Sequence, residues 1–506
     1  MRCWRTALAA GLALLVFAAP ASAAYEANKA SLDKHPLPNW WRDAKFGIFI
    51  HWGPASVPAW TLPDGLAGFW YWLEQQVPGT PTWLHHLLTY GPDVTYDDLI
   101  AKFTASKYDP AAWVRTFKSA GAKYLLLTTK HHDGFALWPS ATSHRNAGYM
   151  GPKRDLVGPL MKAAREQHFK AGLYYSIPEW FNPAPRPALA NIVSSALSMQ
   201  AAPAGVLGDT VFNLSPRNAY TQQPVPYAGY VPIADYAAGQ VRPQLRELIK
   251  RYHPDEIWCD IGGAESYYKS NEIEAEYYNE AVTTSPGGVV VNDRCGDGHT
   301  HNDFLSVEQG NGYTLGTQTI GRPTETDRSI GSWFYSDGNT DAALPTRQSL
   351  LGELITAVSL NSNYVLNISP RADGSLPEPI VSRLEYIGRW LKINGAAIYG
   401  SRPWSQGADD NNTNTRFTVG ADGTFYVTTI GWPGRQLRIA APIPVPAGAR
   451  LELLGSRGAP LSWKRDGKGV VIDLQADMTK ATRSEGAATI RIAVRKQPKY
   501  KRKVQR

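Results

Sequence analysis

Short apolar runs alternate with amphipathic segments over roughly the first 400 residues of this 506-residue chain. The runs are rich in β-branched, leucine and aromatic residues, as buried parallel strands are. They cover residues 46–52, 124–129, 171–177, 256–260, 289–293, 332–335 and 364–369. The segments between them follow a 3.6-residue period and cover 109–121, 154–167, 242–252 and 347–360. This alternation predicts an α/β fold with a parallel sheet covered by helices.

Polar or aromatic side chains stand at the C-terminal ends of many of these predicted strands. They are His51, His131, Tyr174, Asp260, Arg294 and Trp333. In a (β/α)8 barrel all such ends converge on one face, where active sites are built. An open doubly wound sheet with a nucleotide site needs an early glycine-rich turn, which this sequence lacks. The pattern therefore favours a (β/α)8-like (TIM-type) barrel.

The pattern divides the chain into further parts. We assign residues 24–402 to the barrel, with a Pro/Ala-rich insertion at 181–235 that is either a flexible segment or a lid. Residues 403–494 alternate apolar and polar positions, with hairpin signals at "ADG" and "RDGKG", and predict a C-terminal all-β sandwich. Residues 495–506 form a basic tail.

The first 23 residues have the features of a secretory signal. Arg2 and Arg5 precede an apolar stretch, and "ASA" supplies small residues for cleavage. No later stretch is long and apolar enough to span a bilayer. We therefore expect a periplasmic or secreted protein. Cys259 and Cys295 remain after cleavage, and whether they pair is left open.

Composition changes this picture little. Hydrophobic residues make up 43% and charged residues 19%, as in a globular, core-forming protein. The net charge of +8 is spread along the chain apart from the basic tail, so we expect no nucleic-acid partner.

The stretch "TTKHHDGFALWPS" (128–140) places two histidines and an aspartate after a strand. A metal site, a binding site for a polar ligand and a well-satisfied core cap are the three interpretations. Adjacent histidines on an extended strand point in opposite directions, whereas zinc sites commonly use H-x-H or H-x-x-x-H. The binding site is therefore favoured over a metal site, and the chain is expected to need no cofactor.

Three carboxylates are candidates for catalysis. Asp260 ends a strand before "IGG", Glu308 follows in what we interpret as a Gly-rich loop, and Glu325 lies on the next segment. Hydrolysis of a sugar bond needs two carboxyl groups, one to attack or activate water and one to protonate the leaving oxygen. Asp260 with either glutamate would supply that pair.

Several motifs together resemble the α-L-fucosidases of glycoside hydrolase family 29. These are "WWRDAKFGIFIHWGPASVPAW", "AGAKYLLLTTKHHDGFALWPS", "GLYYSIPEW", "EIWCDIGG", "VVVNDR" and "SWFY…NYVLNISPRADGSLPE", which follow in family order along nearly the whole barrel. The resemblance implies a retaining exo-glycosidase that removes terminal α-L-fucose from fucosylated glycans, on a barrel followed by a β-sandwich.

The resemblance also implies roles for individual residues. Asp260 matches the nucleophile, and "NDFLSVE" favours Glu308 as acid/base, with Glu325 as runner-up. The residues that match or flank the fucose-binding set are His51, Trp70, His131, His132, Tyr174, Trp258, Arg294 and Trp333. One departure is Phe69, where many relatives have Glu. It keeps open a fucose-binding, lectin-like protein without catalysis; a metal-dependent barrel hydrolase is the other alternative.

Overall fold

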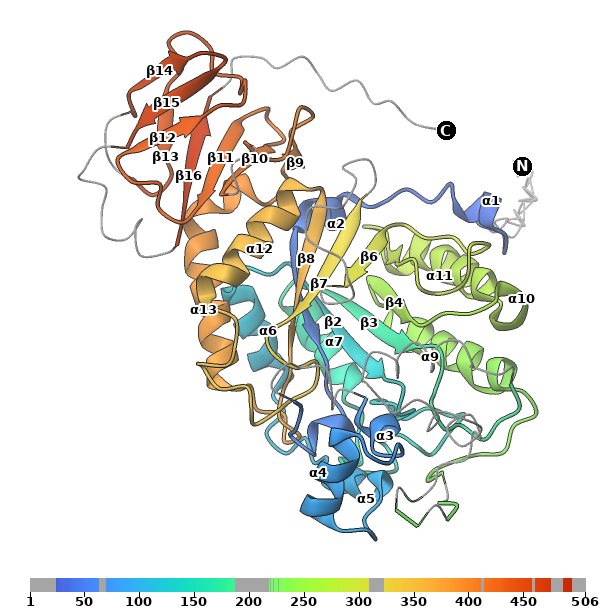
Figure 1. The fold of residues 1–506 in the computed structure, drawn as a ribbon. Coiled ribbons are helices and arrows are strands. Elements are labelled where there is room, and N and C mark those ends of the chain that lie inside the picture. Colours follow the sequence, from blue (N-terminus) through green and yellow to red (C-terminus); the bar gives the residue numbers. More distant parts are fainter. Residues whose placement is uncertain are drawn as a thin grey trace, which may run out of the picture.

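The structure, a computed structural model, has a barrel and a smaller all-β domain (Figure 1). It describes residues 24–62, 70–186, 218, 220–221, 223–225, 227–308, 323–410, 414–456, 460–474 and 486–493. The proposed signal, most of the predicted insertion and the basic tail lie outside these residues. Among the described residues, no helix combines the length and apolar character that crossing a bilayer requires.

Eight parallel strands form one curled sheet, which confirms the predicted fold class. Its order is β5-β4-β3-β2-β1-β8-β7-β6. The strands are β1 (Phe46–Ile50), β2 (Tyr124–Lys130), β3 (Lys170–Ser176), β4 (Glu256–Asp260), β5 (Val290–Val291), β6 (Leu305–Glu308), β7 (Thr324–Ser329) and β8 (Ser362–Ile368).

The two edge strands, β5 and β6, meet along a seam that is held mainly by side chains. One backbone bond crosses it, from Asp303 N–H to the Val291 carbonyl at 3.0 Å. The Asp303 carboxylate accepts from Val291 N–H at 2.9 Å, and the Asp293 carboxylate accepts from Ser306 N–H at 2.9 Å. The seam therefore has far fewer backbone bonds than the strand pairs elsewhere in the sheet.

Two expectations about strands are wrong on this side of the barrel. Residues 332–335 form a loop after β7, and residues 305–308 and 324–329, which lack apolar runs, are strands. Glu308 accordingly ends a strand and does not lie on a loop. Glu325 and Asp327 are buried on β7, so the polar character of this strand reflects a polar barrel interior.

Most of the helices lie on the outside of the sheet, whereas the three between residues 71 and 100 gather at the end of the barrel away from the all-β domain (Figure 1). The helices are α1 (Lys29–Leu32), α2 (Asn39–Ala44), η1 (Pro54–Ser56), α3 (Tyr71–Glu74), α4 (Pro81–Tyr90), α5 (Tyr96–Ile100), α6 (Pro110–Ser119), α7 (Val157–Glu166), η2 (Ala237–Val241), α9 (Arg242–Tyr252), α10 (Glu265–Tyr268), α11 (Ser270–Thr284), α12 (Arg347–Ser359), α13 (Glu378–Asn394) and η3 (Gly395–Ala397). Asp109 caps α6, because its side chain accepts from Ala112 N–H.

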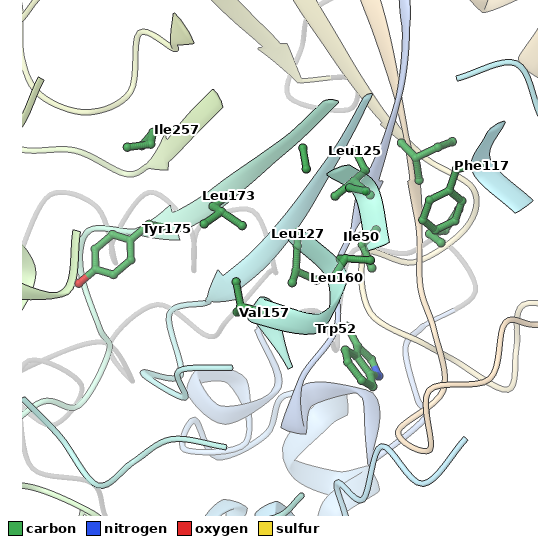
Figure 2. Packing of buried hydrophobic residues seen from close by; sticks show 14 of the residues in the cluster. Ile50, Trp52, Phe117, Leu125, Leu127, Val157, Leu160, Leu173, Tyr175 and Ile257 are labelled. Atoms are coloured by element: carbon green, nitrogen blue, oxygen red, sulfur yellow. The ribbon is translucent and has the colours of Figure 1, made fainter. Parts of the chain in front are cut away.

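Strand residues alternate between two cores. Leu125 and Leu127 of β2 pack outward with Phe117 of α6 and Leu160 of α7 (Figure 2). Leu126, on the same strand, points inward to a separate barrel-interior cluster. Because side chains alternate along a strand, this register directs Glu256, Trp258 and Asp260 of β4 to the interior as well.

The C-terminal domain consists of two antiparallel sheets around its own core. The strands are β9 (Arg402–Pro403), β10 (Thr415–Val419), β11 (Phe425–Ile430), β12 (Gln436–Ile439), β13 (Leu451–Leu453), β14 (Trp463–Asp466), β15 (Gly469–Asp473) and β16 (Ala487–Ile492). Their orders are β13-β16-β11-β10-β9 and β12-β15-β14. In Figure 1 this domain lies at the opposite end of the barrel from α3, α4 and α5.

Candidate active site

Asp260 stands at the C-terminal end of β4, at the mouth of the barrel. Its Oδ2 accepts from the Tyr174 hydroxyl at 2.7 Å and lies 3.4 Å from His132 Nε2. Its Oδ1 accepts from Arg294 Nη1 at 3.2 Å and from the Ile261 N–H at 3.0 Å. Both oxygens are therefore held by donors, and the side chain keeps 16% of its surface exposed.

These partners keep Asp260 ionised. Burial by itself raises the pKa of a carboxyl group, because it disfavours the charged form. Here the hydrogen bond from His132, the charges of His132 and Arg294 and the bond from Tyr174 outweigh burial, so the pKa of Asp260 lies well below its ordinary value. The carboxylate is therefore ionised at neutral pH.

Arg294 joins this carboxylate to that of Glu308. The same Nη1 that donates to Asp260 also donates to Glu308 Oε2 at 3.2 Å, while Nε donates to Ser306 Oγ at 2.8 Å. Because each accepting oxygen lies 3.2 Å from the same nitrogen, the two oxygens can be at most twice 3.2 Å apart. That limit is compatible with the roughly 5–5.5 Å between the carboxyl groups of retaining glycosidases.

Glu308 differs from Asp260 in its proton affinity. Burial raises its pKa, Arg294 lowers it and the negative charge of Asp260 raises it, with a net result above the ordinary value. The pair thus contains one carboxyl group that stays ionised and one that retains its proton to higher pH, the division of roles that acid catalysis on a sugar requires.

Glu325 lies beneath the site and is fully buried. Its oxygens accept from the Tyr124 hydroxyl at 2.6 Å and from Trp258 Nε1 at 3.0 Å. Burial raises its pKa to about 7. With no exposed surface, Glu325 has no path along which to protonate a leaving group at the mouth.

The three predicted histidines gather around Tyr174. His131 stacks on the Tyr174 ring with centroids 5.7 Å apart, and His51 lies 5.7 Å from His131. His51 Nδ1 donates to Asn367 Oδ1 at 2.8 Å, which leaves Nε2 as the acceptor of a neutral ring. Burial lowers the pKa of His51 to about 4, so the ring is uncharged at neutral pH.

The remaining residues of "KHHDGF" support the fold. β2 ends at Lys130, so the two histidines that follow are free of strand geometry and both reach the site. Lys130 is buried and pairs with Glu179 at 2.8 Å, while Asp133 accepts from the Tyr96 hydroxyl at 2.6 Å. Only His131 and His132 of this stretch therefore face the site.

Aromatic rings surround the carboxylates. Trp70 packs against His132 and Trp180, with centroids 6.0 and 5.2 Å away. Trp333 packs against His51 at 4.8 Å, and Trp258 forms the floor under the Arg294 guanidinium at 5.0 Å. These rings offer apolar surface beside the polar groups. Phe69 lies outside the described residues.

Sequence reasoning missed several supporting residues. Asn367 of β8 positions His51 and also donates to the Trp333 carbonyl at 3.0 Å. Phe334 packs against His131 with centroids 5.0 Å apart. Both residues lie in stretches at or beyond barrel strand ends, "LNIS" and "SWFY", and this position was the available signal. It was not sufficient, because nothing in the hydrophobic pattern distinguishes them from core residues.

One set of three residues among those described has the composition of a metal site. Ligand atoms of His35, His301 and Asp303 lie within 4.8 Å of one another, before β6 and so at the barrel end away from the mouth. Asp303 accepts from both histidines and, through its other oxygen, from the Tyr278 hydroxyl at 2.8 Å. These hydrogen bonds account for the arrangement without an ion.

The comparisons with known proteins agree with this geometry. The alpha-L-fucosidase family profile matches residues 12–396. Tissue alpha-L-fucosidase of Mus musculus is 33% identical over 452 residues, covering 88% of this chain and 89% of the relative. The plasma alpha-L-fucosidase of Homo sapiens is 32% identical over 456 residues, covering 88% of this chain and 87% of the relative.

A solved structure adds the fold. The crystal structure of Thermotoga maritima alpha-fucosidase in complex with fucose is similar with a TM-score of 0.73 and 31% identity, covering 93% of this chain and 100% of that one. The agreement extends over both the barrel and the β domain. The chain therefore belongs to the alpha-L-fucosidase family of glycoside hydrolases.

Proposed function

We propose that the protein hydrolyses terminal α-L-fucose from glycans with retention, with Asp260 as nucleophile and Glu308 as acid/base. The observation that carries the assignment is Arg294, which donates to both carboxylates from one nitrogen at 3.2 Å. The opposite directions of their two pKa shifts support the division of roles.

The reaction then has two steps. In the first, Asp260 attacks the anomeric carbon, the glycosidic bond breaks, and Glu308 gives its proton to the leaving oxygen. In the second, Glu308 takes a proton from water, the water oxygen attacks the anomeric carbon, and the Asp260 carboxylate leaves. The low proton affinity of Asp260 suits it to attack first and depart second.

The surrounding groups supply recognition. Neutral His51 accepts a hydrogen bond from a sugar hydroxyl through Nε2, and His131, His132 and Tyr174 offer further polar contacts beside it. Trp70, Trp258 and Trp333 pack on apolar parts of the ring. The reported complex of the Thermotoga maritima enzyme with fucose supports this ligand class.

We also propose that the mature protein works in the periplasm or outside the cell. Support comes from the signal-like first 23 residues and from the disulfide between Cys259 and Cys295. Disulfides persist mainly in oxidising compartments. Fractionation of the producing cells, with assays on each fraction, tests the location.

The function is tested by replacing the nucleophile. Asp260→Ala is expected to lower kcat/KM on an activated aryl α-L-fucoside by several orders of magnitude, since loss of a covalent catalyst removes the favoured route. Asp466→Ala, on β14 of the other domain, is the matched control and should retain wild-type activity. A loss of only a few-fold in Asp260→Ala would refute the assignment, and fucose binding without turnover by the wild type would identify a lectin.

A further inference from the structure

A disulfide directly flanks the two charged residues at the centre of the site. Cys259 precedes Asp260 and Cys295 follows Arg294, and their sulfurs are bonded, with 4.8 Å between the Cα atoms. Asp260 and Arg294 interact at 3.2 Å. The covalent link therefore joins the two chain segments one residue away from the contact on which the catalytic geometry depends.

The backbone provides little support at this level. β5 has two residues, and its register with β4 ends at the pair Ile257 and Val291. Beyond this pair, the Asn292 side chain replaces the backbone hydrogen bonds between the two strands. Its Oδ1 accepts from Cys259 N–H at 2.9 Å, and its Nδ2 donates to the Cys259 carbonyl at 2.9 Å. The disulfide is the next link along the chain, with a Cα separation close to the usual spacing of strands.

Arg294 has weak support on its other side as well. Among the described strands, β5 pairs with β4 alone, and across the seam Arg294 meets β6 through Ser306 Oγ and Glu308. Side-chain bonds of this kind adapt to backbone shifts. The position of Arg294 relative to Asp260 is thus set by Asn292, by the disulfide and by one backbone bridge, between Gly263 and Gly296, that follows it.

The sulfurs do not take part in the chemistry. Cys259 and Cys295 are 2% and 3% exposed and belong to the outer core, and the Cys295 carbonyl accepts from Ser270 Oγ of α11 at 2.6 Å. They border a cavity lined by residues such as Ile177, Leu245 and Ile273. Any effect on catalysis must therefore pass through the position of the backbone.

We propose that the Cys259–Cys295 disulfide is a positioning element of the active site, which holds Arg294 within hydrogen-bond distance of both catalytic carboxyl groups. The inference rests on the roles proposed for Asp260 and Glu308. Full activity then requires that Cys259 and Cys295, which lie outside the substrate site, are oxidised to the disulfide.

The test uses the double variant Cys259→Ser/Cys295→Ser of the full enzyme. We expect kcat on an aryl α-L-fucoside to fall about tenfold or more, because small misplacements of catalytic groups have effects of up to ~100-fold. Both limbs of the pH profile of kcat/KM should move to higher pH. Arg294 lowers the pKa of Asp260 and of Glu308. Without the disulfide, Arg294 would be held less closely to the two carboxyl groups, so both pKa values would rise.

Two controls separate positioning from general stabilisation. Trp390→Phe, remote from the mouth, should lower the melting temperature while leaving kcat and the pH limbs unchanged at 25 °C. Wild-type enzyme in which thiol titration verifies that the disulfide has been reduced should behave like the double variant and recover on reoxidation. If the double variant loses only thermal stability, with kcat and pH limbs like the wild type, the inference is wrong. Peptide mapping that finds both cysteines as thiols in the active enzyme would also overturn it.

The outcome is distinguishable from failure of the proposed function. An inactive Asp260→Ala together with a fully active double variant rejects the positioning role alone. An active Asp260→Ala rejects the assignment of the nucleophile, whatever the disulfide does.

Discussion

At the scale of single residues, the choice between Glu308 and Glu325 is the one that sequence left open. Motif order favours Glu308, but the sequence gives neither the burial of each glutamate nor its distance from Asp260. The structure supplies both: Glu308 shares Arg294 with Asp260, and Glu325 is enclosed by Tyr124 and Trp258. The histidines were predictable because they end strands. Asn367, which orients His51, was not, because its role depends on a contact between β1 and β8.

Glu308→Ala provides the decisive experiment at this scale. We expect a large loss with poor leaving groups, little loss in the first step with activated ones, and recovery with azide, which attacks the intermediate without a general base. The basic limb of the wild-type pH profile, where Glu308 loses its proton above its raised pKa, should disappear in the variant. Glu325→Gln is the control and should show none of these effects. The opposite result would reassign the acid to Glu325.

At the scale of elements, strands were predictable where the chain carries an apolar run. β1 to β5 and β8 carry such runs, and their positions were close to those observed. β6 has the sequence "LSVE" and lines the seam beside Arg294, while β7 has the sequence "TETDRS" and places Glu325 and Asp327 in the polar interior. A pattern search that rewards alternating apolar residues cannot find such strands, and it assigns the strand instead to the aromatic loop "SWFY".

Helix α11 contains a buried acid that gives a stability prediction. Glu274 is 3% exposed, and neither of its oxygens has a hydrogen-bond partner among the described residues. Burial raises its pKa well above the usual value, so the folded state holds the proton more tightly than the unfolded chain. Raising the pH above about 4.5 therefore favours unfolding.

Glu274→Gln removes this titration. Its melting temperature should exceed that of the wild type by more at pH 8 than at pH 5, by an amount that corresponds to about 1–3 kcal/mol at the higher pH. Glu272→Gln on the same helix is the matched control, with a difference that does not grow with pH. A Glu274→Gln variant that is less stable at pH 8 would show that the carboxylate has a partner that holds its charge.

At the scale of the whole molecule, the two domains meet along α12 and α13, far from the barrel mouth (Figure 1). Trp390 of α13 is fully buried, and its Nε1 donates to the Ala487 carbonyl of β16 at 3.0 Å. Arg416 of β10 donates to Thr356 of α12 at 3.2 Å. The hydrophobic pattern predicted that a β domain follows the barrel. Which barrel helices it packs on was not predictable, because that depends on contacts such as Trp390 to Ala487, about 97 positions apart in the sequence.

This arrangement predicts that the β domain stabilises the barrel without taking part in catalysis. Trp390→Phe leaves the Ala487 carbonyl without its donor and opens a gap in the interface, which should cost about 1–3 kcal/mol and lower the melting temperature by several degrees. At 25 °C, kcat and KM should remain within two-fold of the wild type, because changes at distant sites that share no partners act independently.

Trp463→Phe, which removes an equivalent bond to the Ala449 carbonyl inside the β domain, is the control. It should leave the barrel's resistance to proteolysis unchanged, whereas Trp390→Phe should reduce it. A several-fold change in KM for Trp390→Phe would instead mean that the β domain is coupled to the mouth through α12 or α13.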